Sequence, residues 1–391
     1  MGNELLIAGG GIGGLAAAVA ATRAGWSARV FEQAQTFSEV GAGIQLGPNA
    51  TRILRDWGLL EGPLAERVVH PQRLVVCDAV DGGALGGLRL DDFEARYGAP
   101  YLTVHRADLH AALFGTAVAS GVPLHVATAV SSLLETGDCV RVTCPGRADA
   151  EGDALVGADG LWSTVRAHVA GSEAPRYTGH LAYRGLLPFA AGGAASAQVT
   201  AWLGPRMHMV TYPVAGGEFL NVVCIVEGPQ PSGDARSWDH EGVREQLFSS
   251  LGRICSEVRR QLESVAQWRL WPLNGRPRVA SAAQMAKGRV ALLGDAAHPM
   301  LPYLAQGAGM AIEDARELQR VLSVADGRVI DVETALQRYA LSRWQRCARV
   351  QARSLRNATI FHAGGPLRIA RNLSMRVLGE KLLDLPWLYG H

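Results

Sequence analysis

The chain has 391 residues, which predicts about two domains with enough apolar material for their cores. Hydrophobic residues make up 48% of it and charged residues 19%, a composition that excludes intrinsic disorder, and the formal net charge of +2 lacks the basic signature of nucleic-acid binding. The six cysteines are scattered and form no Cys-x-x-Cys pair, so we expect no metal site and a cytoplasmic location, and no stretch reaches the roughly 18 apolar residues of a membrane span.

The first predicted element is a short apolar strand, residues 4–8, which leads through a glycine cluster into an Ala-rich helix. Gly9, Gly11 and Gly14 match the pattern G-x-G-x-x-G. Glycines at this spacing allow a tight turn and let the backbone approach a pyrophosphate, which sits at the helix N-terminus among free N–H groups. The alternative is a Gly-rich turn that binds no ligand.

A second strand, residues 27–32, decides between these two interpretations. It ends at Glu32, which lies 18 residues after Gly14. An acidic residue at this place typically binds a ribose 2′-hydroxyl. The strand–helix–strand context therefore favours a dinucleotide site, and the acid favours FAD or NAD over NADP.

The chain then continues through loops and short strands. Residues 41–49 are rich in glycine and predict a loop, with Asn49 as the N-cap of a helix over residues 50–57. Residues 72–98 predict a short β excursion. A second small-residue turn, Gly157-Ala158-Asp159-Gly160, follows an apolar strand.

The second half of the chain changes character. Strands separated by Gly- and Pro-rich turns dominate residues 175–275 and predict a mainly antiparallel sheet, followed by one helix over residues 241–263. A buried strand over residues 289–293 ends in Gly294-Asp295-Ala-Ala-His298-Pro299, and a Gly-containing loop leads into a helix over residues 311–324.

The remaining residues predict helices rich in arginine. Four arginines recur at three- and four-residue steps and share one helix face, which we interpret as a solvated face rather than a membrane or partner surface. They are Arg346, Arg349, Arg353 and Arg356.

The three glycine-bearing motifs together resemble those of the single-component FAD-dependent aromatic hydroxylases, which include salicylate hydroxylase, 3-hydroxybenzoate 6-hydroxylase and 6-hydroxynicotinate 3-monooxygenase. The resemblance covers residues 9 to about 324. It implies an α/β fold, with a Rossmann-type FAD-binding domain, an inserted mainly antiparallel β-sheet substrate domain and C-terminal helices. The implied segments are FAD-binding parts at 1–71, 99–174 and 276–330, a β excursion joining the substrate domain at 72–98, the substrate-binding sheet at 175–275 and C-terminal helices at 331–391.

The resemblance also implies the cofactor contacts. FAD is expected to bind without a covalent bond, and NADH or NADPH is expected as a transient co-substrate, because the chain holds a single G-x-G-x-x-G match. Asp159 and Asp295 can also act as helix caps, and the two roles do not exclude each other. The implied FAD contacts are Gly9, Gly11, Gly13, Gly14, Glu32, Gln33, Arg106, Val130, Asp159, Gly160, Asp295, Gly307, Ala308 and Gly309.

For the substrate side, His208 and Tyr212 lie four residues apart in a predicted strand and therefore point to the same face. A histidine in a strand is more often structural, but the pair resembles the substrate contacts of the family, so we assign both to catalysis together with Gln306. Gln45, Tyr303 and Leu304 are expected to line the pocket. We interpret His298 as a structural or surface-gating residue, and Tyr183 and Arg184 as structural.

The implied reaction is hydroxylation of a small phenolic aromatic carboxylate, similar to 3-hydroxybenzoate or salicylate, by NAD(P)H and O2 through a flavin C4a-hydroperoxide. Gln45 and Tyr303 stand where the hydroxynicotinate enzyme carries histidines, which disfavours a pyridine substrate. The alternatives are a 6-hydroxynicotinate-type hydroxylase, a flavin dehydrogenase or reductase of the same fold, and a flavin-binding module without turnover. A homodimer through the C-terminal helices stays open.

Overall fold

The computed structural model describes residues 3–37, 43–189, 197–234, 236, 240–325 and 330–390. The chain divides into two compact units, and each is assembled from three stretches. Unit 1 comprises Met1–Val40, Leu109–Pro175 and Gly275–Ser354, and unit 2 comprises Gly41–Asp108, Arg176–Asn274 and Leu355–His391. Gly41 and Ala42 of the predicted loop lie outside the described residues.

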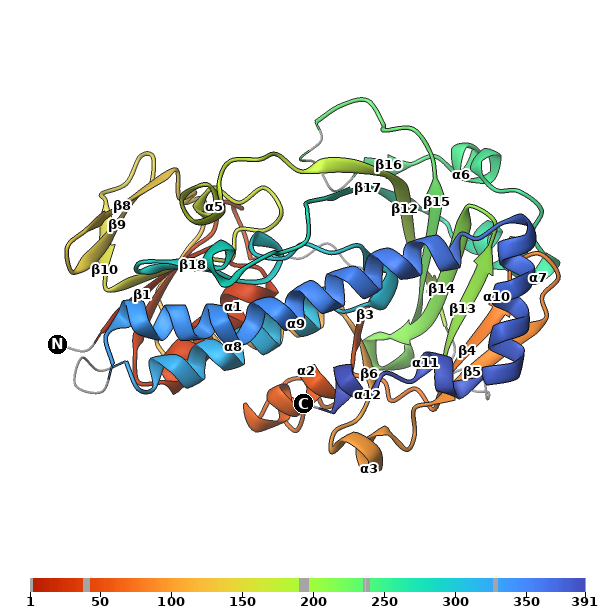
Figure 1. Ribbon diagram of the computed structural model, residues 1–391, viewed down its shortest axis with the longest axis horizontal. Coiled ribbons are helices and arrows are strands. Elements are labelled where there is room, and N and C mark those ends of the chain that lie inside the picture. The colour runs from red at the N-terminus through yellow and green to blue at the C-terminus, as the bar shows by residue number, and fades with distance from the viewer. Residues whose placement is uncertain are drawn as a thin grey trace. The chain divides into compact units, whose positions relative to one another are not determined.

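Unit 1 is built on a six-stranded sheet whose neighbouring strands are parallel except for the β18–β19 pair (Figure 1). In spatial order the strands are β18 (Ala286–Lys287), β19 (Val290–Leu292), β11 (Ala154–Gly157), β1 (Glu4–Ala8), β2 (Ser27–Phe31) and β7 (Leu124–His125). A separate antiparallel sheet contains β8 (Ser132–Thr136), β9 (Cys139–Thr143) and β10 (Ala150–Gly152).

Helices cover the parallel sheet of unit 1. The Ala-rich helix α1 packs against α8, because its small side chains allow close approach. The interior of β1 is fully buried, as expected for a central parallel strand that is covered on both faces. The helices are α1 (Ile12–Arg23), α4 (Arg106–Ala119), α5 (Val165–Ala170), α8 (Gly307–Leu322) and α9 (Val332–Phe361), of which α4 and α9 also contribute residues to unit 2.

Unit 2 is built on an eight-stranded sheet. The β13–β4 pair is parallel, whereas β12–β15, β15–β14, β14–β13 and β4–β5 are antiparallel. In spatial order the strands are β16 (His240–Gly242), β17 (Trp268–Gly275), β12 (Arg176–Pro188), β15 (Phe219–Glu227), β14 (Met207–Val214), β13 (Gln198–Gly204), β4 (Arg73–Asp78) and β5 (Ala84–Arg89).

The other elements of unit 2 are short, apart from α10. A two-stranded antiparallel sheet contains β3 (Gly43–Leu46) and β6 (Leu102–His105). The helices are α2 (Pro48–Asp56), α3 (Phe93–Tyr97), α6 (Arg244–Ser250), α7 (Ser256–Ser264), α10 (Gly365–Leu378), α11 (Glu380–Leu383) and α12 (Pro386–Tyr389).

The two faces of the eight-stranded sheet bury different clusters, because successive residues of a strand point to opposite sides. One face packs Met207 and Met209 of β14 against apolar residues of α6 and α7, among them Leu247 and Val258. The other face packs residues of β4, β5 and β13 against Met375 of α10. His208 and Tyr212 belong to this second face, since they alternate with Met207 and Met209 along β14.

The predicted α/β class is confirmed, with its parallel sheet, its mainly antiparallel sheet and its C-terminal helices. Three local predictions are wrong. The loop expected over residues 41–49 contains strand β3, Gly43–Leu46, whose residues pair with β6, and its last two residues begin α2. Asn49 is not an N-cap, because α2 begins at Pro48, whose fixed φ suits the first helical position. The helix expected over residues 241–263 is instead strand β16 followed by α6 and α7, with the weak helix former Gly252 in the break between the helices. The six-segment domain division stays a prediction.

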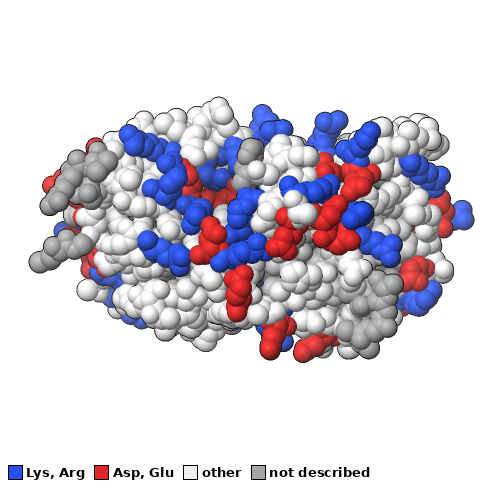
Figure 2. Space-filling view, turned by 90° about the horizontal axis from the view of Figure 1, so that it is seen from below, with Lys and Arg blue, Asp and Glu red and all other residues white. Residues whose placement is uncertain are grey.

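No helix in the described part of the chain combines the length and the apolar character needed to cross a membrane. Basic and acidic side chains of the described residues are intermixed on the face shown in Figure 2, in keeping with the small formal net charge of +2.

Candidate active site

Three glycine-bearing turns of unit 1 follow β1, β11 and β19, which lie side by side in the parallel sheet. Gly9 has a φ of 102°, and a Cβ placed there would collide with the carbonyl oxygen of Ala158. A Cβ at Gly14 would collide with the carbonyl oxygen of Gly9, and one at Gly13 would lie 2.9 Å from Leu293 Cδ2. The glycines therefore let the first turn contact the second and third turns at the carboxyl edge of the sheet, where such sheets bind ligands.

The first turn fits the phosphates and ribose of a dinucleotide. Helix α1 begins at Ile12. Its N-cap, Gly11, has no side chain that could accept hydrogen bonds from the first N–H groups of the helix, so these groups can bind an anion. Glu32 Oε2 accepts a hydrogen bond from the Gly10 N–H at 2.6 Å, and Oε1 accepts one from the Ala34 N–H at 2.7 Å. The carboxylate is thus held beside the glycine turn, where a ribose hydroxyl can donate to it.

The second turn adds a buried carboxylate. Asp159 Oδ2 accepts hydrogen bonds from the N–H groups of Thr164 and Val165 at 2.8 and 3.2 Å, which ties the second turn to the N-terminus of α5, although the N-cap residue itself is Thr164. Its other oxygen, Oδ1, is buried and has no hydrogen-bond partner among the described residues. Burial raises the pKa of Asp159 despite these bonds. An orphaned buried oxygen fits a partner supplied by a bound molecule.

The third turn leads into α8, whose N-terminus is also uncapped. The helix begins at Gly307, four residues before the predicted start, and its N-cap Gln306 makes no side-chain capping bond. Ala305 precedes it with a φ of 51°, an uncommon conformation for a residue with a Cβ. The first turn of α8, formed by Gly307, Ala308 and Gly309, therefore presents N–H groups that favour a negative charge.

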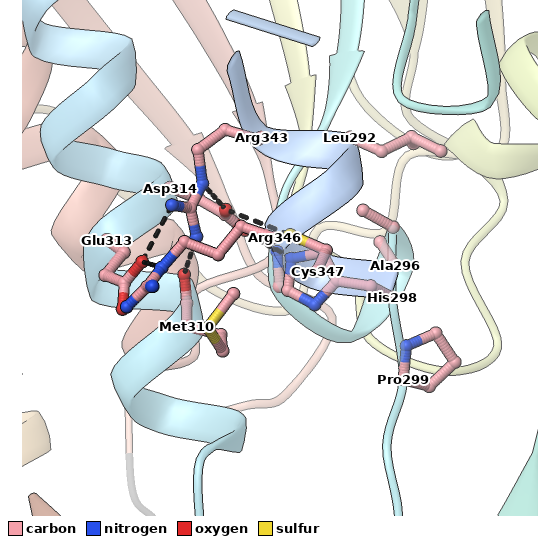
Figure 3. Close-up of polar contacts among 12 residues, drawn as sticks. Leu292, Ala296, His298, Pro299, Met310, Glu313, Asp314, Arg343, Arg346 and Cys347 are labelled. Carbon is pink, nitrogen blue, oxygen red and sulfur yellow. Dashed lines mark hydrogen bonds and ion pairs between the residues drawn. The ribbon is translucent and has the colours of Figure 1, made fainter. Parts of the chain in front are cut away.

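A buried ionic network holds the third turn to α8 and α9 (Figure 3). Asp314 accepts hydrogen bonds from His298 Nε2 at 2.5 Å, Arg343 Nε at 2.7 Å and the Gly294 N–H at 3.0 Å. Arg343 also pairs with Glu313 at 2.7 Å. Burial opposes a charge on His298, but Asp314 outweighs it and raises the His298 pKa well above its ordinary value. His298 is 1% exposed, which fits the structural interpretation and not a surface gate.

In unit 2, three polar side chains meet at the end of β14. The Tyr101 hydroxyl donates to Gln45 Oε1 at 2.8 Å, and Gln45 also hydrogen-bonds to Tyr212. The Tyr212 ring packs on Gly43, where a Cβ would collide with it. Burial raises the pKa of Tyr101 and of Tyr212, so both hydroxyls keep their protons at neutral pH. Tyr101 was not predicted to be a site residue, because in the sequence it is simply the first residue of a predicted strand.

Arg184 lies on the same sheet face as Tyr212. It is opposite Val223 of β15, which is opposite Val210 of β14. Its guanidinium carbon is 4.0 Å from the ring centroid of Trp271, and its Nε is buried without a hydrogen-bond partner among the described residues. Burial, and then the charge of Arg106, lower its pKa to about 10, so it remains a cation at neutral pH. The sequence contained one signal for Arg184 as a site residue: a charged residue in a strand whose neighbours on the same face are apolar.

His208 lies toward the other end of the same face. Its Nδ1 is 2.9 Å from His362 Nε2, and its ring contacts Phe361 edge-on. Burial, and then His362 and His180, lower its pKa well below the ordinary value, so His208 is neutral at pH 7. The expectation that His208 and Tyr212 share a strand face is confirmed by the register of β14 with β15. Their contact with a substrate stays a prediction.

The remaining predicted site residues are distributed over both units. Tyr303 and Gln306 are buried, Leu304 is half-buried, Gln33 and Asp295 are exposed and Val130 is buried. Gln45, Arg106, His208 and Tyr212 belong to unit 2, and the other predicted site residues belong to unit 1.

Known proteins resemble this chain over its whole length. A family described as an FAD binding domain matches residues 3–354. The 3-hydroxybenzoate 6-hydroxylase of Polaromonas naphthalenivorans is 38% identical over 394 residues, covering 99% of this chain and 95% of the relative. The chain belongs to the FAD-dependent aromatic hydroxylases. The family recognised from the three motifs is thereby confirmed.

A second sequence relative and one solved structure are also similar to this hydroxylase. The 3-amino-4-hydroxybenzoate 2-monooxygenase of Streptomyces cremeus is 37% identical over 391 residues, covering 99% of this chain and 95% of the relative. The crystal structure of Klebsiella pneumoniae HpxO complexed with FAD and uric acid matches with a TM-score of 0.85 at 24% identity, covering 97% of this chain and 94% of that chain. The latter match shows a shared fold.

FAD is the cofactor of the hydroxylase, and the predicted cofactor is confirmed. When bound, it supplies the redox and oxygen chemistry of the family, and NADH or NADPH is the typical co-substrate. The uncapped N-termini of α1 and α8, the held carboxylate of Glu32 and the orphaned oxygen of Asp159 fit the binding of this group. The role of each individual residue stays a prediction.

The hydroxylase has two groups of three side chains, among its described residues, whose ligand-type atoms lie within 4.8 Å of one another. They are His298, Asp314 and Cys347, and His180, Glu227 and His362. In each group, hydrogen bonds already join a histidine to a carboxylate, and the first group also contacts the Arg343 cation. We assign neither group to a metal.

Proposed function

We propose that this hydroxylase acts on a small phenolic aromatic carboxylate, similar to 3-hydroxybenzoate or salicylate, and uses NAD(P)H and O2. The observation that carries the proposal is the Arg184 cation, which lies on the same sheet face as the tyrosine hydroxyl of Tyr212 and has a buried Nε without a partner among the described residues. A buried charge needs an opposite charge, and a carboxylate matches a guanidinium in geometry. The names of the relatives at 37–38% identity, which are hydroxybenzoate enzymes, support the same class.

The other polar groups of the site suit the rest of such a ring. Tyr212, Tyr101 and Gln45 offer donors and an acceptor for ring substituents, and His208 is a neutral imidazole that can accept the phenolic proton. Loss of that proton makes the ring more electron-rich and so more easily hydroxylated. Gln306, Tyr303 and Leu304, which belong to unit 1, stay proposed as substrate contacts on the resemblance to the family.

The activity test is NADH and NADPH oxidation by the FAD-loaded protein with 3-hydroxybenzoate, salicylate, 3-amino-4-hydroxybenzoate and 6-hydroxynicotinate. Product and hydrogen peroxide are measured in the same samples. We expect one of the hydroxybenzoates to give product with little peroxide. Reduction of FAD without a hydroxylated product from any compound would favour the dehydrogenase alternative, and a product from hydroxynicotinate alone would favour the pyridine hydroxylase.

The role of Arg184 is tested by Arg184→Met, with Arg269→Met as the control because Arg269 is an exposed arginine of the same sheet. A charge-assisted hydrogen bond contributes about 1.5–3 kcal/mol, so the Kd for the carboxylate substrate should rise on the order of 10- to 100-fold. The Kd for the uncharged amide of the same substrate should change little. An equal weakening of acid and amide would show that Arg184 does not bind the carboxylate.

Location and assembly belong to the same proposal. All six cysteines are free, which supports a reducing compartment such as the cytoplasm. Exposed Ile369, Leu373 and Val377 recur every four residues along α10 and support a homodimer through the C-terminal helices. Sedimentation of the wild type and of Leu373→Glu tests this: a monomer in both would exclude the dimer.

A further inference from the structure

A chain of hydrogen-bonding groups leads from His208 toward the surface of unit 2. His208 Nδ1 lies 2.9 Å from His362 Nε2, and His362 Nδ1 lies 3.3 Å from Glu227 Oε1. His208 and His362 are buried, whereas the Glu227 side chain is 35% exposed. Arg206 Nε contacts the other carboxylate oxygen of Glu227 at 3.1 Å and so orients Oε1 toward His362.

The chemistry of these groups fixes the direction of each bond. An ionised carboxylate only accepts hydrogen bonds, so the Nδ1 of a neutral His362 must carry the hydrogen that Glu227 accepts. The Nε2 of His362 is then the acceptor, and His208 must donate to it from Nδ1. This leaves Nε2 of His208 as the ring nitrogen without hydrogen, which is the nitrogen able to take up a proton.

We propose that Glu227 and His362 are positioning residues that hold His208 in its Nδ1–H tautomer and relay the substrate's phenolic proton to solvent. This rests on the proposed function. The phenolic O–H bond breaks and its proton binds His208 Nε2, while the Nδ1 proton of His208 passes to His362 Nε2. The Nδ1 proton of His362 passes to Glu227 Oε1 and is released to water. One proton enters the chain and one leaves it, and the reverse sequence returns a proton to the product.

The surroundings of His362 favour transfer without a lasting cation. His180 of β12 lies with its ring centroid 5.2 Å from that of His362, and Arg371 of α10 adds a further positive charge nearby. Burial, and then His180, lower the pKa of His362 to about 4 in spite of Glu227. Both imidazoles are therefore neutral at pH 7, and each can accept a proton on one nitrogen as it gives one up from the other.

The tautomer is tested without any substrate. Protein labelled with 15N-histidine and loaded with FAD gives long-range 15N–1H spectra in which the protonated ring nitrogen of His208 is identified, with His208→Gln used for assignment. In the wild type we expect His208 to be entirely in the Nδ1–H form. In Glu227→Gln we expect a mixture of His208 tautomers, because a side-chain amide can donate a hydrogen bond to His362 as well as accept one and so no longer fixes the direction of the chain. An Nε2–H form of His208 in the wild type would overturn the proposal.

The relay is tested by stopped-flow proton release into a weakly buffered indicator when the hydroxylated substrate binds. For His362→Phe and Glu227→Gln we expect release to slow on the order of 10- to 100-fold, with less than about a threefold change in substrate Kd. His168→Gln is the matched control, since His168 forms a comparable 2.9 Å pair with Glu135 in unit 1. Glu227→Gln keeps the test decisive if His362→Phe does not fold.

The outcomes separate the relay from the proposed function. Unchanged release in Glu227→Gln and His362→Phe, with substrate bound and FAD still reduced by NADH, would overturn the relay alone. If no phenolic acid stimulates NADH oxidation in the wild type, the proposed function fails, and the tautomer spectra still decide whether Glu227 and His362 orient His208.

Discussion

Replacing Asp314 by asparagine perturbs the ionic network beneath the third glycine turn with almost no change of shape. Asp314 is fully buried and carries the negative charge between His298 and Arg343. In Asp314→Asn the side-chain oxygen and nitrogen cannot accept all four hydrogen bonds that Asp314 accepts, and one of the two cations loses its partner. We expect lower stability and weaker FAD retention together, because one of the donors to Asp314 is the N–H of Gly294 in the third glycine turn.

The expected loss of stability in Asp314→Asn depends on the interactions that His298 and Arg343 keep in the variant. Removing one partner of a buried ion pair typically costs about 3–5 kcal/mol, against a total stability of about 5–15 kcal/mol. Arg343 keeps its 2.7 Å pair with Glu313, and His298 can lose its proton. Both effects reduce the loss of stability. We therefore expect Asp314→Asn to lower the free energy of unfolding at neutral pH by about 3 kcal/mol, the lower end of that range.

The loss should also depend on pH. The pKa of His298 is raised above its ordinary 6.5, so the network's contribution is complete below pH 6.5 and declines as pH rises through the higher folded value. Burial opposes ionisation of Asp314, but His298 and Arg343 outweigh it and lower its pKa from 3.8 to about 2. Its contribution is therefore present above about pH 4 and is lost between pH 4 and 2. The difference between wild type and variant should be largest between about pH 4 and 6.5.

The assay is urea unfolding of the FAD-loaded proteins, followed by circular dichroism and flavin fluorescence at several pH values. Glu317→Gln is the control, because Glu317 belongs to the same helix but pairs with Arg320, which is 64% exposed. Because Arg320 is exposed to water, this pair contributes at most about 1 kcal/mol, even though the Glu317 side chain itself is 14% exposed. If Asp314→Asn lowers the free energy of unfolding no more than Glu317→Gln, the network is not the stabilising element inferred here.

Three further perturbations address the cofactor and the substrate. Gly14→Ala should abolish FAD binding or folding, because its Cβ would collide with the Gly9 carbonyl oxygen. The control is Gly115→Ala in α4, which has open space around it and should leave stability unchanged or raise it by up to about 1 kcal/mol. Thermal melts and the flavin content of the purified proteins compare the two variants. Glu32→Ala should lose FAD during gel filtration, and a fully loaded variant would argue against the ribose contact. His208→Phe should retain FAD but form more peroxide and less product per NADH, and unchanged coupling would remove His208 from the reaction.

The glycine turns were predictable because their pattern is local. A strand, a turn and a helix N-terminus follow each other within about 20 residues, and the steric demand on Gly9 and Gly14 comes from atoms of the same turn or its neighbour in the sheet. The shared face of His208 and Tyr212 was predictable for a similar reason, since side chains alternate along a strand.

The partners of these residues were not predictable, because they come from distant segments. His362 meets His208 across 154 positions of the sequence, and Arg343 meets Asp314 across 29. Nothing in the local pattern of a helical arginine distinguishes a buried ion pair from a solvated face. Arg346 shows this: its interpretation as part of a solvated face is wrong, because it pairs with Glu313 at 2.6 Å and its side chain is 17% exposed.

The interleaving of the two units along the chain constrains how the protein can be made and recombined. β1, α1 and β2 are synthesised within the first 31 residues, but β19 and α8 follow only after residue 289. At about 5–20 residues per second, the ribosome leaves the first glycine turn without these neighbours for roughly 10–50 s. Neither unit corresponds to a contiguous fragment, so a chimera that grafts one unit onto a homologue must exchange three stretches at once.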